Sequence, residues 1–307
     1  MKDAIYKGKG IVPVPATFCL DAGHPFPYPP DNHQIFEEWF LKNFGESDVR
    51  DRIYLPIFWT GYYVRANYGK DSSKINVLQY YLDHLDRSLK YYTIVQYDDG
   101  ILNHVEHLDI KVYSMSGTPV DYSLPLLCQP HAYQFDCTRD IFMSFVGRNN
   151  HRFRDIILKK FAKDSDCYVT EKYHSLEDYC KILARSVFAL CPRGYGPTSF
   201  RIAEALQYGA IPVAISDILI LPHLPLHNLP PACHVITFSG KELDNLRRNL
   251  ENPPPSLTVA KLLAKIPSYY DTYYSYEGNK TIILKTLEHG TDKDRSGTYQ
   301  PDPAENN

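Results

Sequence analysis

The sequence contains no long hydrophobic run. Its 307 residues include no stretch of about 18 uncharged apolar residues, the length that a transmembrane helix needs. Residues 1–20 carry four charged side chains and two prolines, unlike the apolar segment of a signal peptide. We therefore expect no membrane anchor and a cytoplasmic location.

An excess of charge of one sign is also missing. Lys and Arg number 33 against 36 Asp and Glu, for a net charge of −3, and 44% of the residues are hydrophobic. This balance excludes a disordered chain and argues against nucleic acid or an anionic membrane as a partner. The length of the chain favours two domains with a cleft between them over one large core.

Paired cysteines are absent as well. The seven cysteines include no C-x-x-C pair and no zinc-like spacing, and most have apolar or aromatic neighbours. This pattern is typical of buried, reduced thiols in a reducing compartment. We expect no catalytic metal.

What the sequence does contain is an alternation of strands and helices. In the second half, we predict strands at 141–146, 167–170, 187–191 and 211–215, and helices at 152–161, 175–185, 198–208 and 259–266. The first half is less regular, with strands at 53–59 and 91–97 around a helix at 73–89 whose apolar face includes Val77 and Tyr80. This order predicts an α/β fold with parallel sheets, which bind ligands at the carboxyl ends of their strands.

A glycine-rich turn lies between the third predicted strand and the third predicted helix of the second half. Gly194 and Gly196 let the backbone approach a ligand closely, and unpaired amides at a helix start bind anions such as phosphate. We place Pro197 at the first helical position and Arg201 in the first turn, as a planar charged partner for a diphosphate. Glu204, three residues further along the same face, is placed to accept hydrogen bonds from ribose hydroxyls. The segment therefore outlines a nucleotide-diphosphate site.

Two alternative interpretations of this segment stay open. Arg201 and Glu204 have the i, i+3 spacing of a surface ion pair, which needs no ligand. The run 194–199 also approximates the dinucleotide fingerprint G-x-G-x-x-G/A, with Asp217 at the end of the next strand. An NAD-dependent oxidoreductase is therefore a second hypothesis, although Ser199 stands at the third position and a proline removes one amide from the turn.

Six short motifs occur in order between residues 141 and 225. They are Phe145-Val-Gly-Arg148, Ser186-x-Phe-x-Leu-Cys-Pro-Arg-Gly194, Ser199-x-Arg201-x-x-Glu-Ala205, Gly209-Ala-Ile-Pro-Val213, Ser216-Asp217 and Leu221-Pro222. Together they resemble the exostosin-like glycosyltransferases of family 47. Outside this stretch, Tyr97-Asp98-Asp99-Gly100 is similar to the Asp-x-Gly segment of plant members. The chain is most similar to short, anchor-less versions from large DNA viruses of algae, which would place it in the host cytoplasm.

The resemblance implies a GT-B fold of two facing Rossmann-like domains. It implies an inverting transfer of a sugar from a UDP-sugar to a glycan hydroxyl, with no bound metal or other cofactor. We divide the chain into an acceptor-binding domain at 1–135, a nucleotide-sugar-binding domain at 136–275, and a C-terminal helix and disordered tail at 276–307. Xylose is the sugar expected from the viral resemblance, with glucuronic acid and galactose left open.

The same resemblance implies roles for individual residues. Arg148 and Arg201 correspond to the partners of the diphosphate, and Glu204 corresponds to the partner of the ribose. The turn around the donor would consist of Arg193, Gly194 and Ser199.

An inverting transfer also needs a base that deprotonates the acceptor hydroxyl. We expect this base on a loop after a strand of the first half, where Asp71 and Asp98 are the catalytic candidates and Asp21 and His24 are further ones. Asp71 also fits a helix cap, and Asp98 an ordinary turn. The sequence does not separate these two.

Two further features of the sequence have more than one interpretation, and one further functional hypothesis remains. Tyr62, Tyr63 and Tyr68 are candidates for a platform on which an acceptor sugar stacks. The run 164–166 matches the Asp-x-Asp motif of metal-dependent sugar transferases, but its position favours a solvated turn. A non-catalytic carbohydrate-binding protein is the third functional hypothesis, which the retention of a nucleotide site opposes.

Overall fold

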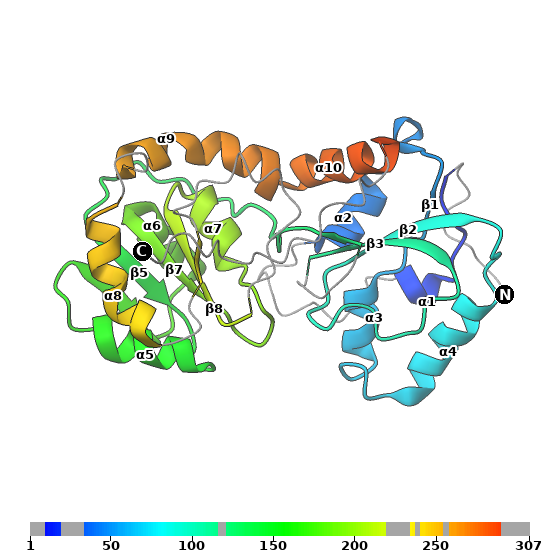
Figure 1. Cartoon of the computed structure of the whole chain (residues 1–307), viewed down its shortest axis with the longest axis horizontal. Helices are drawn as coiled ribbons and strands as arrows, with labels where there is room; N and C mark the ends of the chain where they lie inside the picture. Colours follow the sequence, from blue (N-terminus) through cyan, green and yellow to red (C-terminus); the bar gives the residue numbers. More distant parts are fainter. Residues whose placement is uncertain are drawn as a thin grey trace, which may run out of the picture.

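The computed structural model of the chain describes residues 10–19, 34–115, 121–218, 234–236, 240–253 and 258–289. Two parallel β-sheets follow one another along these residues, with helices packed against them (Figure 1). The predicted α/β class with parallel sheets is confirmed. No helix in the described ranges is both long and apolar enough to cross a membrane. The six cysteines in these ranges are free thiols, and four of them are buried.

The first sheet has four parallel strands in the order β1-β2-β3-β4. Its strands are β1 Ile53–Tyr54, β2 Lys90–Val95, β3 Asp109–Ser114 and β4 Tyr122–Ser123. The elements around it are α1 Ala16–Cys19, α2 Phe36–Lys42, the 3-10 turn η1 Glu46–Asp48, α3 Trp59–Arg65 and α4 Ser72–Asp83. Aromatic rings fill much of its core, as in the stacked pair Tyr54 and Tyr92, whose centroids are 5.1 Å apart. Many of the tyrosines are therefore core residues.

The second sheet has five parallel strands in the order β6-β5-β7-β8-β9. Its strands are β5 Ile141–Val146, β6 Cys167–Thr170, β7 Ser186–Pro192, β8 Ile211–Ser216 and β9 His234–Ile236. Its helices are α5 Arg152–Phe161, α6 Leu176–Arg185, α7 Arg201–Gln207 and α8 Gly240–Glu251. The chain runs outward from β5 to β6 and then crosses back to β7, so the strand order reverses between β5 and β7. Ligands of open α/β sheets bind at such a reversal, outside the carboxyl ends of the strands.

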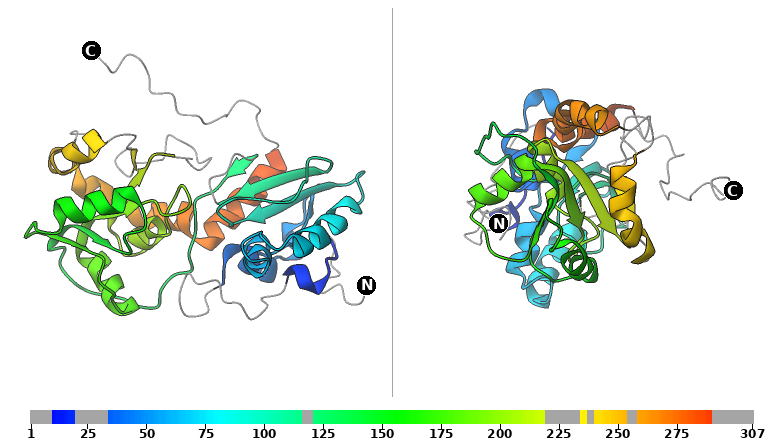
Figure 2. Two further views of the ribbon diagram at one scale, coloured as in Figure 1. Left: turned by 90° about the horizontal axis from the view of Figure 1, so that it is seen from below. Right: turned by 90° about the vertical axis from the view of Figure 1, so that its left-hand side faces the viewer.

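The C-terminal helices connect the two halves of the molecule. Helix α9, Val259–Tyr269, packs beside α7 and β8, and a π-helical turn η5 at Tyr270–Tyr274 leads into α10, Tyr276–His289. Helix α10 lies along the first sheet (Figures 1 and 2), where the hydroxyls of Thr286 and Tyr113 are 2.7 Å apart. The last described helix therefore packs against the first half, although it follows the second half in sequence.

The strand predicted at 53–59 is wrong beyond Tyr54. Pro56 has no backbone N–H to donate to a neighbouring strand, and the amide of Phe58 donates instead to the carbonyl of Phe18 at 2.9 Å. The chain therefore leaves the sheet, and helix α3 begins at Trp59.

The helix predicted at 73–89 is shorter, and its buried face differs from the prediction. Helix α4 ends at Asp83, and Leu78 and Leu82 are its fully buried residues, whereas Val77 and Tyr80 are exposed. A tyrosine ring carries a hydroxyl that water solvates, so it does not mark a buried face as reliably as a leucine does.

Candidate active site

Two loops meet where the strand order of the second sheet reverses. Gly147 and Arg148 follow β5, and Arg193 to Gly196 follow β7, so both loops lie at the carboxyl ends of neighbouring strands. The side chain of Arg148 is exposed there, and those of Arg193 and Arg201 are half-buried. The structure thus brings together the three arginines that the sequence assigned to the donor.

Arg201 joins helix α7 to the end of β5. Its Nη2 donates to the carbonyl of Val146 at 2.7 Å, and its Cζ lies 4.9 Å from the centre of the Phe145 ring. A Cβ at Gly147 would lie 2.7 Å from the same Nη2. Glycine at position 147 therefore provides the space that this guanidinium occupies.

Helix α7 begins later than the prediction of 198–208. Its first residue is Arg201, and the hydroxyl of Ser199 accepts the Arg201 amide at 3.3 Å. Pro197 lies in a bend before the helix, where its carbonyl accepts a hydrogen bond from the Ser216 hydroxyl at 2.9 Å. The placement of Pro197 at the first helical position is therefore wrong, and Ser199 supports the start of the helix.

Arg154 is a member of this cluster that the sequence analysis missed. Its guanidinium donates to the carbonyls of Arg148 at 3.2 Å, Arg193 at 3.2 Å and Pro192 at 3.3 Å. Burial, and then the charge of nearby Arg201, lower the pKa of Arg154 to about 10. No local signal distinguishes it from its exposed neighbour Arg152, because only the fold shows which arginine of α5 faces the loops.

This arginine cluster favours an anion. Arg154 and Arg201 lie within 6 Å of the same Phe145 ring, with Cζ-to-centroid distances of 5.9 and 4.9 Å. Each of two like charges held close together raises the electrostatic cost of the other. An anion at the end of β5 would relieve this repulsion, and a diphosphate fits the geometry of guanidinium groups.

Arg193 holds the glycine turn in shape. Its Nη1 donates to the carbonyls of Gly194 at 3.3 Å and Tyr195 at 3.2 Å, and its Nε donates to the Asp217 carboxylate. Asp217 also accepts from Arg152 at 2.8 Å. Hydrogen bonding to Arg193 lowers the pKa of Asp217. Asp217 is thus engaged by two arginines, which is unlike the free ribose-binding acid that a dinucleotide site requires.

Glu204 lies in the interior of the molecule. Its carboxylate accepts a hydrogen bond from the hydroxyl of Tyr179 at 2.7 Å and lies 3.1 Å from Nε2 of His131. The residue is only 2% exposed, so a solvated ion pair with Arg201 on the surface is wrong. Its contact with a ribose stays a prediction. His131 belongs to the segment 129–140, which therefore packs against helix α7.

The turn Asp98-Asp99-Gly100 after β2, the acidic turn, lies against the turn Gly194-Tyr195-Gly196 after β7, the glycine turn. A Cβ at Gly196 would come within 2.5 Å of Oδ1 of Asp98. The hydroxyl of Tyr195 donates to the carboxylate of Asp99, at 3.2 Å to Oδ1 and 3.4 Å to Oδ2. One of the two candidate bases therefore faces the predicted donor site.

The environments of Asp98 and Asp71 separate these two candidates. Burial, and then the charge of Asp99, raise the pKa of Asp98 to about 6, and no hydrogen-bond donor to its carboxylate is found in the described part of the chain. Asp71 is the N-cap of α4 and accepts from the amides of Ser73 and Lys74. The hydroxyl of Ser73 contributes most to lowering the pKa of Asp71. A base needs a pKa near the working pH, which favours Asp98.

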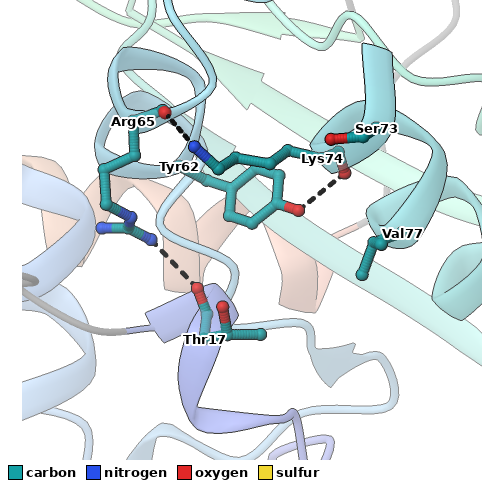
Figure 3. A pocket seen from close by; sticks show the side chains of 6 residues that line it. All are labelled: Thr17, Tyr62, Arg65, Ser73, Lys74 and Val77. Atoms are coloured by element: carbon teal, nitrogen blue, oxygen red, sulfur yellow. Dashed lines mark hydrogen bonds between the residues drawn. The ribbon is translucent and has the colours of Figure 1, made fainter. Parts of the chain in front are cut away.

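A separate cavity of about 350 Å³ opens between α1, α3 and α4 (Figure 3). Its lining residues are Thr17, Tyr62, Arg65, Ser73, Lys74 and Val77. Several of its polar groups bond to one another: Lys74 Nζ donates to the carbonyl of Arg65 at 2.7 Å, and Arg65 donates to that of Thr17 at 2.9 Å. None of the predicted donor residues lines it, and neither Asp98 nor Asp71 does.

The structure also bears on the predicted tyrosine platform and on the Asp-x-Asp run at 164–166. Tyr63 is fully buried in the core, and Tyr62 is only 4% exposed and lines the cavity of Figure 3, whereas Tyr68 is 57% exposed. Asp164 and Asp166 both accept from Arg247, at 2.9 and 2.6 Å, so this pair forms a structural link to α8. Asp21, His24, the motif 221–222 and the tail after 289 lie outside the described residues.

Sequence comparisons agree with the resemblance of the second half. Residues 112–228 match the Exostosin GT47 domain. A probable glycosyltransferase of Arabidopsis thaliana is 30% identical over 118 residues, 38% of this chain and 25% of that protein. A probable glucuronoxylan glucuronosyltransferase of the same plant is 36% identical over 99 residues, 32% of this chain and 20% of the relative. A probable beta-1,4-xylosyltransferase, also from this plant, is 31% identical over 165 residues, 50% of this chain and 39% of the relative.

These similarities concern one part of the chain, which resembles a domain of family 47. The matches span between a fifth and about two fifths of the length of these curated relatives. The domain match includes every residue predicted for the donor site, from Arg148 to Glu204, and includes neither Asp71 nor Asp98.

Proposed function

We propose that this chain is an inverting glycosyltransferase of the GT-B type, which transfers a sugar from a UDP-sugar to a hydroxyl of a glycan. Two parallel sheets with loops that face each other support this proposal. The observation that carries it is the contact of the Asp98 turn with the glycine turn, next to the arginine cluster. The proposed base and the arginines proposed to bind the anionic leaving group then belong to turns that meet at the junction of the two halves.

The arginines bind and stabilise the diphosphate of the donor in this proposal. Arg148 and Arg201 contact its oxygens, and Arg154 holds the loops that carry Arg148 and Arg193. As the bond between the sugar and the diphosphate breaks, the leaving oxygen takes both electrons, and the guanidinium groups stabilise the negative charge that develops. These groups supply positive charge without a metal, so we expect transfer to persist in EDTA.

Asp98 acts as the general base. Its carboxylate takes the proton of the acceptor hydroxyl while that oxygen forms a bond to the anomeric carbon, on the face opposite the departing diphosphate. The attack from the opposite face inverts the anomeric configuration. A pKa of about 6 leaves Asp98 mostly ionised at pH 7 and still basic enough to accept a proton.

The names of the matched relatives mention glucuronosyl and xylosyl transfer, so UDP-glucuronic acid and UDP-xylose are the first donors to test. Xylose remains our first expectation, with glucuronic acid and galactose next.

A melting experiment with a panel of nucleotides tests the class of the protein. We expect UDP and one UDP-sugar to raise the unfolding temperature and NAD to leave it unchanged. Incubation of that UDP-sugar with a panel of glycans should then release UDP and form a product with inverted configuration, with and without EDTA. Stabilisation by NAD alone would favour an oxidoreductase, and glycan binding without turnover of any donor would favour a carbohydrate-binding protein.

A further inference from the structure

Two exposed tyrosines stand in the loops near the junction of the two halves, and one of them contacts a carboxylate of the turn after β2. Tyr195 is 77% exposed and Tyr68 is 57% exposed, although most large aromatic side chains of the first half are buried. Tyr195 belongs to the glycine turn after β7, and Tyr68 to the loop between α3 and α4. The two residues therefore come from different halves of the chain.

The ring of Tyr195 is held at its hydroxyl end. The hydroxyl donates to Asp99, and the two neighbouring residues, Gly194 and Gly196, carry no side chains that would cover the ring. No aromatic ring in the described ranges stacks on it. Its faces are consequently open to solvent while its direction is fixed by the bond to Asp99.

The backbone of Tyr68 is in an unusual conformation for a residue with a side chain. Its φ is +56°, between Asn67 at +52° and Gly69 at +79°. The loop is held by hydrogen bonds from the Gly69 amide to the Tyr63 carbonyl at 3.3 Å and from the Asp71 amide to the Ala66 carbonyl at 2.9 Å. Such strain is concentrated at functional sites, and core packing does not explain it for an exposed ring.

The buried Tyr97 is affected electrostatically by both exposed tyrosines and by both carboxylates of the acidic turn. Burial raises the pKa of Tyr97 to about 12, with further contributions from Asp99, Tyr195, Asp98 and Tyr68, in that order. All four groups therefore lie within electrostatic range of the Tyr97 hydroxyl. The geometry at this junction is given by two contacts, the bond from the Tyr195 hydroxyl to Asp99 and the packing of Asp98 against Gly196.

We propose that Tyr195 and Tyr68 form the acceptor subsite and that this subsite takes an uncharged sugar ring of a glycan. The inference rests on the proposed function. The apolar C–H face of a sugar stacks on an aromatic ring. The Tyr195 hydroxyl bonds to Asp99, the residue next to the proposed base, and Tyr68 is the second exposed ring within electrostatic range of Tyr97. Asp98 and Asp99 add two negative charges, which repel a uronic acid at this position. An uncharged sugar carries only hydroxyls, which donate to these carboxylates.

Binding of oligosaccharides to the UDP-saturated protein tests this subsite. The probes are xylohexaose, cellohexaose, mannohexaose and hexagalacturonate, with titration calorimetry as the readout. We expect at least one neutral hexaose to bind and hexagalacturonate to bind at least tenfold more weakly. Tyr195→Ala and Tyr68→Ala should each weaken binding of that hexaose by about five- to tenfold, while the affinity for UDP stays unchanged.

Two further variants separate the ring from its hydroxyl and from general surface effects. Tyr195→Phe keeps the stacking face and removes the bond to Asp99, so it should weaken hexaose binding less than Tyr195→Ala does. Tyr173→Ala removes a tyrosine that is 95% exposed elsewhere on the surface, and should change nothing. In turnover, Tyr195→Ala should raise the KM for the acceptor and leave the KM for the donor unchanged.

Several results would overturn the subsite. They are equal or tighter binding of hexagalacturonate, no binding of any neutral hexaose, or unchanged hexaose affinity in both alanine variants. Failure of the proposed function gives a different result, because the parent protein would then fail to bind UDP or to turn over any UDP-sugar.

Discussion

Asp98 packs against Gly196 so closely that a Cβ on the glycine would lie 2.5 Å from Oδ1 of the aspartate. Asp98 follows a strand of the first sheet, and Gly196 follows a strand of the second. The contact is accompanied by the hydrogen bond between Tyr195 and Asp99, so the two turns meet at two adjacent positions. This junction positions the proposed base relative to the donor.

Substitution of this glycine should displace the base. In Gly196→Ala the new methyl group forces the Asp98 carboxylate away, so we expect kcat to fall on the order of 100-fold, with the affinity for UDP largely retained. Steady-state kinetics and UDP titration measure both quantities. Gly61→Ala is the matched control, because a Cβ there meets nothing closer than 3.7 Å within helix α3. Wild-type kcat in Gly196→Ala would show that the contact has no catalytic importance.

Arg148 should contribute to donor binding without contributing to stability. Its side chain is exposed, so Arg148→Ala should weaken UDP binding about tenfold or more and leave the unfolding temperature unchanged. Calorimetric titration with UDP measures the affinity. Arg87→Ala removes another exposed arginine, outside the cluster, and should leave UDP binding intact. Equal affinities in the two variants would remove Arg148 from the donor site.

The pH dependence of transfer should report the ionisation of Asp98. Because the base must be deprotonated, kcat/KM should fall as the pH drops through about 6, where Asp98 takes up its proton. Asp98→Asn should lower kcat by about 100-fold or more and remove this acidic limb. Asp99→Asn removes a neighbouring negative charge, so the limb should move to lower pH. An acidic limb that persists unchanged in Asp98→Asn would assign the base to another residue.

Asp71 should act on stability and not on chemistry. Asp71→Ala removes the side-chain acceptor of the α4 N-cap, which should lower the unfolding temperature by a few degrees while transfer is retained. Asp71→Asn is the control, because Asn caps helices about as well as Asp and cannot act as a base. Loss of transfer in a stable Asp71→Asn protein would instead identify Asp71 as the base.

Glu37 should make the folded state less stable as the pH rises. The residue is completely buried, its carboxylate accepts from the Gln96 amide at 2.7 Å and the Thr60 hydroxyl at 2.8 Å, and burial raises its pKa to about 8. The folded state thus keeps a proton that the unfolded chain, with an ordinary pKa of 4.5, releases. Stability conferred by this group is therefore lost between about pH 4.5 and 8, at no more than about 1.4 kcal/mol per pH unit.

Glu37→Gln tests this effect, because glutamine mimics the protonated carboxyl group. Urea unfolding at pH 5, 6.5 and 8 should show a flatter dependence of the free energy of unfolding on pH in the variant than in the parent. The prediction is wrong if the parent protein becomes more stable between pH 5 and 8 and Glu37→Gln removes that increase.

Local signals predicted the second half of the chain well. The strands at 141–146 and 167–170 and the helix at 152–161 have the predicted bounds, and Ser175 caps its helix through the Asp178 amide at 3.0 Å. Short apolar runs and capping residues act between near neighbours, so the sequence displays them directly. In the first half, the apolar run 53–59 predicted too long a strand because it contains Pro56. The spacing of Tyr80 predicted a buried position, but this tyrosine is exposed.

The individual site residues were only partly predictable. The motifs singled out arginines that the structure brings together, and their role in donor binding stays a prediction. The burial of Glu204 against Tyr179 and His131 depends on segments 25 and 73 residues away. Arg154 could not be distinguished from its neighbours in α5, because its partners are carbonyl groups of two loops. A carbonyl is present at every residue, so its use as a partner leaves no mark in the sequence.

The sequence by itself determined the alternation of strands and helices, the glycine turn and the set of arginines near it, because periodicity, caps and turn residues act over a few positions. Only the tertiary structure decided which carboxylate faces that turn. Asp99 and Tyr195 are 96 residues apart, and the packing of two sheets brings them together. Asp98 and Asp71 are both acids on loops of the same half. Burial at this junction raises the pKa of Asp98, whereas the hydrogen bonds of the α4 cap lower the pKa of Asp71.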